Sequence, residues 1–203
     1  MSGLFVSFEG IDGSGKSTQA RMLHDRLAAL GRPVLLTREP GGSPGAEAIR
    51  ALLVEGDAGR WSAEAELLLF PAARRDHLER LIAPALAAGT TVVTDRFADS
   101  TRIYQGRAGL RADVDGLHAR FIGREPDLTI LIDIDPEEAL SRSARRASHE
   151  DRFESRGLAF HRALRDGFLQ LAAEAPDRIV TVDGARPPEA IAEEIAAIHA
   201  ARA

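Results

Sequence analysis

The chain has no cysteine, and only one of its 26 lysine and arginine residues is a lysine. The lack of cysteine excludes disulfide bonds and metal sites built on thiolates. No apolar run approaches the roughly 20 residues that a membrane-spanning helix needs. The start "MSGLFVSFEG" has no basic leader followed by a long apolar core. We therefore expect a soluble protein with a cytoplasmic location and no membrane partner.

An excess of positive charge is also missing, because the formal net charge is −5. Nonspecific nucleic-acid binding ordinarily needs a basic surface, so we expect no nucleic-acid partner. A length of 203 residues suits a single domain that buries a substantial core. No repeat, low-complexity block or linker divides the chain, and residues 1–203 are predicted to form one domain.

Short apolar runs alternate with longer segments of helical periodicity, which predicts an α/β fold. Most runs carry no internal charge, as expected of parallel strands that helices cover on both faces. Helices are predicted over residues 16–30, closed by Gly31 and Pro33, and over residues 63–88, closed by Gly89 and kinked at Pro84. Further helices are expected after "DPEE", "EDRFES" and "RPPEA". The predicted strands are residues 4–8, 34–37, 91–95, 128–133 and 179–182.

Residues 10–17, "GIDGSGKS", fit the pattern G-x-x-x-x-G-K-[ST] between a predicted strand and a predicted helix. The glycines let backbone N–H groups turn toward an anion, and the helix start brings its positive dipole end to the same point. Lys16 can reach the outer phosphates with a compact ammonium, and Ser17 can bind Mg²⁺. A plain glycine turn is the alternative. The predicted nucleotide-binding residues are Gly10, Ile11, Asp12, Gly13, Ser14, Gly15, Lys16, Ser17 and Thr18.

The phosphate loop alone names no reaction, because switches, motors and kinases all contain it. A guanine-nucleotide switch would be expected to read its base through an N-K-x-D segment. This chain has no asparagine, and its only lysine is Lys16. The chain is also small for a motor and has no evident partner-binding appendage. A small-molecule phosphotransferase is therefore favoured.

Several segments, in family order, together resemble the thymidylate kinases of bacteria. They are "FEGIDGSGKST", "TREPGG" at 37–42, "FPAARR" at 70–75, "DRFADSTRIYQG" at 95–106 and "EDRFE" at 150–154. The resemblance implies ATP-dependent phosphorylation of dTMP to dTDP with Mg²⁺, usually by a homodimer. It also implies a P-loop NTPase fold of the nucleoside monophosphate kinase type, with three α/β/α layers around a five-stranded parallel sheet. Another nucleoside monophosphate kinase and a nonenzymatic nucleotide-binding module remain the alternatives.

The acceptor side of the predicted site combines one helix face with two strand ends. Phe70 and Arg74 lie four residues apart, so a ring can stack on a base while a guanidinium donates to a base carbonyl. Arg38 and Arg96 directly follow predicted strands and suit a monophosphate. Taken alone, the spacing of Phe70 and Arg74 favours a core ring and a surface charge, and only the family match reverses this. A surface ion pair is the alternative for Arg38 and Arg96. By resemblance, the substrate-binding residues are Asp12, Arg38, Glu39, Phe70, Arg74, Arg96, Ser100, Thr101, Tyr104 and Gln105.

Individual roles follow from the same resemblance. Asp12 lies inside the phosphate loop, where a carboxylate needs a compensating partner. It would contact the 3′-hydroxyl region of the substrate, or else only stabilise the turn. Glu39 could instead serve only to orient Arg38. Tyr104 would lie against the 2′ position of the sugar, or else only pack its helix on the sheet. Asp95 ends a predicted strand and could hold Mg²⁺ through water, together with Ser17.

Phosphoryl transfer also needs cationic charge over the migrating group. Some thymidylate kinases place an arginine directly after the acidic residue of the loop, but Gly13 stands there in this chain. By resemblance to the bacterial pattern, a mobile lid at about 141–154 supplies the charge. A solvated face is the alternative for any one of its arginines. The predicted catalytic residues are Asp12, Lys16, Arg96, Arg142, Arg145, Arg146 and Arg152.

Overall fold

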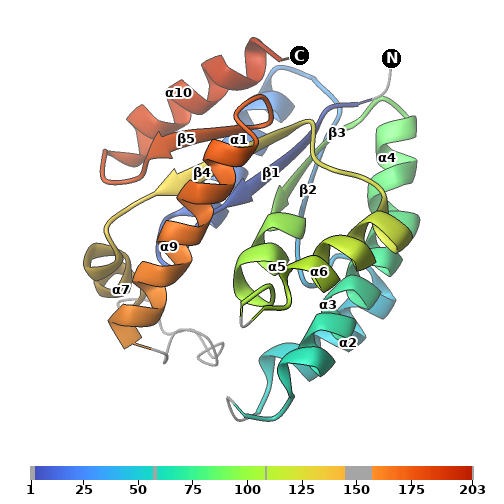
Figure 1. Ribbon diagram of the computed structural model, residues 1–203. Helices are drawn as coiled ribbons and strands as arrows, with labels where there is room; N and C mark the ends of the chain where they lie inside the picture. The colour runs from blue at the N-terminus through green and yellow to red at the C-terminus, as the bar shows by residue number, and fades with distance from the viewer. Residues whose placement is uncertain (1–2, 57–58, 108, 145–156, 203) are drawn as a thin grey trace.

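The computed structural model describes residues 3–56, 59–107, 109–144 and 157–202. Its centre is a five-stranded parallel sheet in the order β2-β3-β1-β4-β5 (Figure 1). The strands are β1 (Phe5–Glu9), β2 (Val34–Arg38), β3 (Thr91–Asp95), β4 (Leu128–Asp133) and β5 (Ile179–Asp183). All five predicted strands are confirmed, and none of their ends differs by more than one residue.

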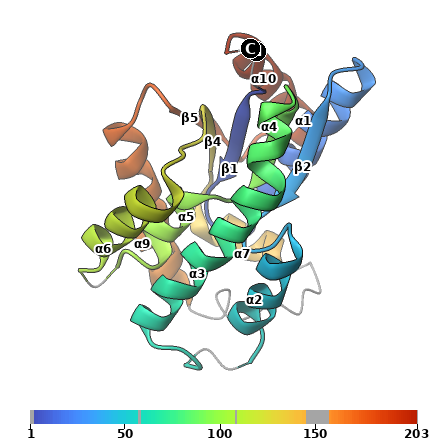
Figure 2. The same cartoon turned by 90° about the vertical axis from the view of Figure 1, so that its right-hand side faces the viewer.

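Helices cover both faces of the sheet (Figures 1 and 2). Side chains alternate between faces along a strand, so Val6 and Phe8 pack on one side and Phe5 on the other. The first face carries α1 (Lys16–Ala29) and α10 (Pro188–Ala200). The second face carries α9 (Gly157–Glu174), η1 (Leu78–Ile82) and α4 (Ala83–Ala87). This is the predicted three-layer α/β/α arrangement.

The long helix predicted over residues 63–88 is confirmed over residues 63–87, with a change of helix type inside it. α3 (Ala63–His77) leads into η1, a turn of π-helix, and α4 follows. Pro84 has no N–H group, and its ring clashes with a carbonyl oxygen one turn back, so the preceding turn widens. The disturbance predicted at Pro84 therefore lies in the turn before it.

The other helices differ in whether the sequence predicts their position. The three segments "DPEE", "EDRFES" and "RPPEA" precede or open α7 (Pro136–Ala144), α9 and α10, as expected. The helices for which the sequence predicts no bounds are α2 (Pro44–Val54), α5 (Ala98–Tyr104), α6 (Arg111–Leu117) and η2 (His118–Ile122). In the four described ranges, no helix is long and apolar enough to cross a membrane.

The register of the sheet brings the predicted site residues to one edge. In the parallel ladder, Phe8 of β1 pairs with Asp95 of β3, and Asp95 pairs with Arg38 of β2. The carboxyl ends of β1, β2 and β3 therefore lie side by side. The loops that follow these strands, together with α3 and α5, surround the space beyond this edge. Ligands of open α/β sheets bind in that position.

Candidate active site

A pocket of about 320 Å³ opens at the carboxyl edge of the sheet. Among the predicted site residues, it is lined by Asp12, Gly13, Gly15, Lys16, Ser17, Arg38, Glu39, Phe70, Arg74, Asp95, Arg96, Ser100, Thr101, Tyr104 and Gln105. Five residues that the sequence does not predict also line it: Pro40, Arg50, Val54, Phe97 and Ser143. The predicted residues Gly10, Ile11, Ser14, Thr18 and Arg142 are not among its lining residues. Ile11 is buried instead in the cluster between the sheet, α7 and α9.

The phosphate loop turns tightly from β1 into α1. Lys16 is 5% exposed, and its Nζ donates to the carbonyl oxygen of Ile11 at 2.7 Å. Burial lowers the pKa of Lys16 to about 8, with Arg96 adding to the effect against the charges of Asp12 and Asp95. A bound phosphate would oppose this shift, because a nearby anion favours the ammonium form. A bound anion would therefore offset the desolvation of the Lys16 ammonium.

Gly13 directly follows Asp12, the acidic residue of the loop. Its φ is 82°, and a Cβ built there would lie 2.0 Å from the carbonyl oxygen of Ala139 in α7. The loop therefore packs directly on α7 and leaves no room for a side chain. A cationic side chain at this position is therefore excluded.

Asp12, Arg96 and Tyr104 form a polar group beside the loop. Arg96 Nη2 donates to Asp12 Oδ1, and the Tyr104 hydroxyl donates to Asp12 Oδ2 at 3.1 Å. The Arg96 guanidinium also lies over the Tyr104 ring, 5.1 Å from its centroid. Burial alone would raise the pKa of Asp12, but the charges of Arg96 and Lys16 hold it at about 2. Asp12 thus has an arginine as the compensating partner that its position requires.

Glu9 is a buried carboxylate behind this group that the sequence analysis misses. It accepts from the Phe97 backbone N–H at 2.8 Å and from Ser100 Oγ at 2.6 Å. Ser100 Oγ in turn accepts from Arg96 Nη1 at 2.7 Å. Arg96 has a φ of 70°, a positive value that no other described residue except glycine shares. Glu9 therefore stabilises the turn that orients Arg96. The one sign of its role in the sequence is that it is the only charged residue of an otherwise uncharged strand.

Phe70, Arg74 and Gln105, which are predicted to bind the substrate, line the pocket together with the phosphate loop. Phe70 is partly exposed at the pocket and not part of the core, whereas Arg74 is 3% exposed. Arg74 Nη2 donates to Thr101 Oγ1 at 2.9 Å, and its Nε donates to Glu39 Oε2 at 2.7 Å. Gln105 is buried and donates to Glu66 Oε2 at 3.3 Å. An aromatic face, a guanidinium and an amide thus meet on one side of the pocket.

The proposed alternative role of Glu39, to orient Arg38, is wrong. Both carboxylate oxygens of Glu39 are engaged elsewhere, with Arg74 and with His77. Arg38 instead pairs with Glu47 of α2, at 3.2 Å and 3.3 Å, and its side chain is 54% exposed. Glu39 points inward from the strand end while Arg38 points outward, because neighbouring residues of an extended chain face opposite sides.

Ser17 and Asp95 were predicted as metal ligands and are in contact. Ser17 Oγ donates to Asp95 Oδ2, and the buried Asp95 Oδ1 has no hydrogen-bond partner in the part of the chain that the structure describes. A hydroxyl and a carboxylate with an unused oxygen are hard ligands of the kind Mg²⁺ accepts beside phosphate. These residues fit a magnesium ion that is also held by a nucleotide.

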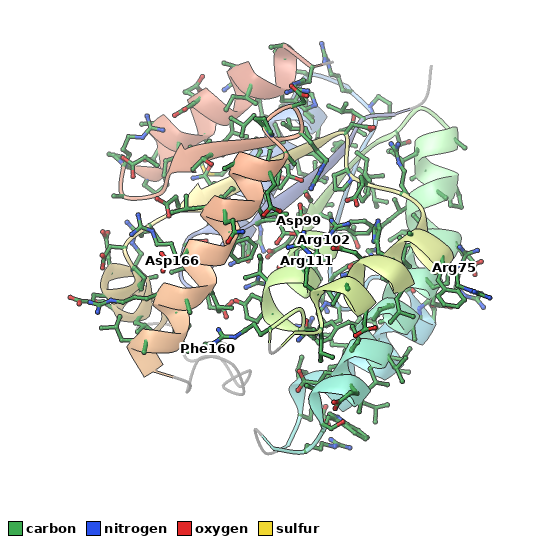
Figure 3. All side chains as sticks on the ribbon, in the orientation of Figure 1. Arg75, Asp99, Arg102, Arg111, Phe160 and Asp166 are labelled. Atoms are coloured by element: carbon green, nitrogen blue, oxygen red, sulfur yellow. The ribbon has the colours of Figure 1, made fainter. Side chains whose placement is uncertain are left out.

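An ionic cluster anchors α5 beneath the pocket. Asp99 is 2% exposed and accepts from Arg102 Nη1 at 2.7 Å and from Arg178 Nη1 at 2.6 Å. Arg102 also pairs with Asp115 and Glu125. Figure 3 shows Asp99 and Arg102 close together near the middle of the molecule. Arg178 directly precedes β5, so the cluster connects α5 to the start of that strand. α5 carries the side chains of Ser100, Thr101 and Tyr104.

The predicted lid arginines fall mostly outside the described residues. This holds for Arg145, Arg146 and Arg152. Arg142 belongs to α7, where its Nη1 donates to the Gly184 carbonyl at 2.9 Å and its Nη2 to Glu138 at 2.6 Å. Ser143, its neighbour, lines the pocket. The roles of these arginines stay predictions.

Comparison with known proteins places this site in a family. The model of the thymidylate kinase family matches residues 8–195. The thymidylate kinase of Dinoroseobacter shibae is 66% identical over 197 residues, which cover 96% of this chain and 95% of that protein. The thymidylate kinase of Jannaschia sp. is 63% identical over 200 residues, covering 98% and 96%. The crystal structure of thymidylate kinase from Ehrlichia chaffeensis has a TM-score of 0.77 and 33% identity, covering 98% of this chain and 99% of that one. The chain belongs to the thymidylate kinase family.

Proposed function

We propose a division of roles among the pocket residues for the reaction of this family, the ATP-dependent phosphorylation of dTMP to dTDP. An oxygen of the dTMP phosphate attacks the γ-phosphorus of ATP, the bond from that phosphorus to the bridging oxygen breaks, and ADP leaves. The observation that carries the proposal is the meeting of a phosphate loop and a base-sized wall of Phe70, Arg74 and Gln105 in one pocket. The phosphate loop serves the donor, and the wall serves the acceptor.

On the acceptor side, Phe70 stacks on the thymine ring while Arg74 donates to a base carbonyl. Among the described residues, the side-chain hydrogen bonds of Arg74 go to Glu39 and Thr101 through Nε and Nη2, so the N–H groups of Nη1 serve this purpose. Arg38 and Arg96 bind the monophosphate of dTMP. In this proposal the substrate phosphate competes with Asp12 for Arg96, which frees the Asp12 carboxylate for the sugar hydroxyl.

On the donor side, Lys16 binds the outer phosphates and the N-terminus of α1 receives them through backbone N–H groups. Mg²⁺ would be held by Ser17 and Asp95, where it would neutralise charge on the phosphate oxygens. Arg142, Arg145, Arg146 and Arg152 supply the further cationic charge, as lid arginines in the segment 141–154. The packing of Gly13 against α7 supports this assignment, because no cation fits at that position.

We also propose that the protein acts as a homodimer. Two of the four large hydrophobic side chains that are exposed in the described residues are Leu68 of α3, at 62%, and Phe121 of η2, at 48%. α3 and η2 pack against each other, and Arg75 Nη1 donates to the Phe121 carbonyl at 2.7 Å. Exposed apolar side chains on adjoining helices are typical of an interface. A cytoplasmic location, which the sequence favours, stays a prediction.

A coupled assay of ADP release over a panel of nucleoside monophosphates tests the assignment of the base wall. Phe70→Ala is expected to raise the KM for dTMP about tenfold, because base–aromatic stacking contributes roughly 1–3 kcal/mol. The KM for ATP should stay within about twofold, since the donor lies on the phosphate loop. An unchanged KM for dTMP, or equal changes for both substrates, would contradict the role of Phe70.

A further inference from the structure

We propose that His77 is a positioning residue for dTMP recognition, acting through Glu39 on Arg74. His77 is fully buried and is not among the residues that line the pocket. It therefore acts on the substrate only through another side chain. The proposal rests on the base-binding role assigned to Arg74 above.

A chain of hydrogen bonds runs from β2 through His77 to the base wall. His77 Nε2 lies 2.8 Å from Thr37 Oγ1, and His77 Nδ1 lies 3.1 Å from Glu39 Oε1. The other oxygen of Glu39, Oε2, accepts from Arg74 Nε at 2.7 Å. Arg74 Nη2 then donates to Thr101 Oγ1 of α5 at 2.9 Å. Five side chains from β2, the turn after it, α3 and α5 are thus connected.

The hydrogen-bond partner of His77 Nδ1 determines whether that nitrogen carries a proton. A carboxylate only accepts hydrogen bonds, so His77 Nδ1 carries the proton that Glu39 receives. The Thr37 hydroxyl completes the contact at Nε2, where a hydroxyl can either donate or accept. The proton on Nδ1 holds one oxygen of Glu39 in turn.

Fixing Glu39 matters because both of its oxygens are used. With Oε1 held by His77, Oε2 presents a single direction to Arg74, and the guanidinium lies over the Phe97 ring at 4.9 Å from the centroid. Without His77, Glu39 would be free to rotate and Arg74 would lose this orientation. A displacement of a binding group by a fraction of an ångström weakens substrate recognition while leaving the donor site intact.

Gly42 provides a second, independent observation of close fit around His77. Its φ is 89°, and a Cβ built there would lie 2.3 Å from His77 Nε2 and 2.5 Å from Thr37 Oγ1. The second glycine of "TREPGG" thus leaves the space that the imidazole and the hydroxyl occupy. The motif "TREPGG" supplies Thr37, Glu39 and this space, and α3 supplies Arg74 and His77 three residues apart.

Two substitutions of similar size separate a positioning role from core filling. In His77→Asn the amide nitrogen takes a place close to that of Nδ1 and still donates to Glu39. In His77→Gln the amide reaches toward Thr37 and leaves Glu39 without its donor. Both remove the aromatic ring from the interior, so thermal unfolding is expected to report similar losses of stability for the two variants.

The measurement is the steady-state kcat and KM for dTMP and for ATP in the full chain. His77→Gln is expected to raise the KM for dTMP about tenfold with the KM for ATP unchanged, and His77→Asn to restore most of the dTMP affinity. An unchanged KM for dTMP in His77→Gln, or the same increase in both variants, overturns the proposal. Arg74→Ala is measured in parallel. If it leaves the KM for dTMP unchanged, the base-binding role of Arg74 itself is wrong.

A spectroscopic measurement on the wild-type protein needs no variant to fold. In protein labelled with ¹⁵N-histidine, the His77 ring is expected to be protonated on Nδ1 and to shift when dTMP is added. A ring without a proton on Nδ1, or one that saturating dTMP leaves unchanged, overturns the proposal.

Discussion

At the scale of single residues, Glu9 makes stability depend on pH. Burial and then the charge of Asp99 raise its pKa to about 7, although Arg96 and the hydrogen bonds from Ser100 and Phe97 act in the other direction. Between pH 4.5 and about 7 the folded protein therefore holds a proton that the unfolded chain has released. The contribution of Glu9 to stability is complete below this window and is lost as the pH rises through it.

Glu9→Gln removes this titration and is expected to change the pH profile of the unfolding free energy. Relative to the variant, the wild type should lose stability between about pH 4.5 and 7, by roughly 1.4 kcal/mol for each unit of pKa shift. Urea unfolding at a series of pH values measures the difference. Glu64→Gln, at an exposed position on α3, is the control for the loss of one carboxylate. Parallel profiles for Glu9→Gln and the wild type would contradict the raised pKa.

The sequence identified most pocket residues by type but not their partners. Lys16, Arg96 and Phe70 could be predicted because each belongs to a short motif or follows a strand end. The contact of Glu39 with Arg74 joins residues 35 positions apart and depends on how far α3 lies from β2. No local pattern contains that distance. The sequence therefore predicts Glu39 as a substrate-binding residue, or else as a partner of its neighbour Arg38, and misses its contact with Arg74.

At the scale of elements, strands were easier to predict than helices. A parallel strand covered on both faces appears as a short, continuous apolar run with defined ends. By contrast, α5 is seven residues long and buries Asp99, Ser100 and Thr101, which no amphipathic pattern would favour. Its stability comes from partners in distant segments, so its local sequence gives little indication of a helix.

The anchoring of α5 by Asp99 leads to a prediction at this scale. Asp99→Asn keeps the shape of the side chain but removes the buried carboxylate that pairs with Arg178, whereas Arg102 keeps Asp115 and Glu125. We expect a loss of about 3 kcal/mol in unfolding free energy, because breaking a buried ion pair leaves an uncompensated charge. The KM for dTMP should rise as well, since α5 carries Ser100 and Thr101. Urea unfolding and steady-state kinetics measure the two effects.

Asp115→Asn serves as the matched control for this prediction. Asp115 also pairs with Arg102, at 2.8 Å, but its side chain is 43% exposed. An exposed ion pair contributes less than about 1 kcal/mol, so this variant should stay close to the wild type in both measurements. Equal effects of the two substitutions would mean that burial of Asp99 does not determine the strength of the anchor.

At the scale of the whole molecule, the exposed pair Leu68 and Phe121 predicts self-association. A two-fold axis brings the same patch of two copies together, so one apolar face can cover itself. We expect the wild type to be a dimer in size-exclusion chromatography with light scattering, and the double variant Leu68→Glu/Phe121→Glu to be a monomer, because like charges would then face each other without solvent. Leu30→Glu is the control, since Leu30 is 66% exposed but follows α1 on the opposite face of the sheet, and it should leave the dimer intact. A monomeric wild type, or a double variant that stays dimeric, would show that α3 and η2 do not form the interface.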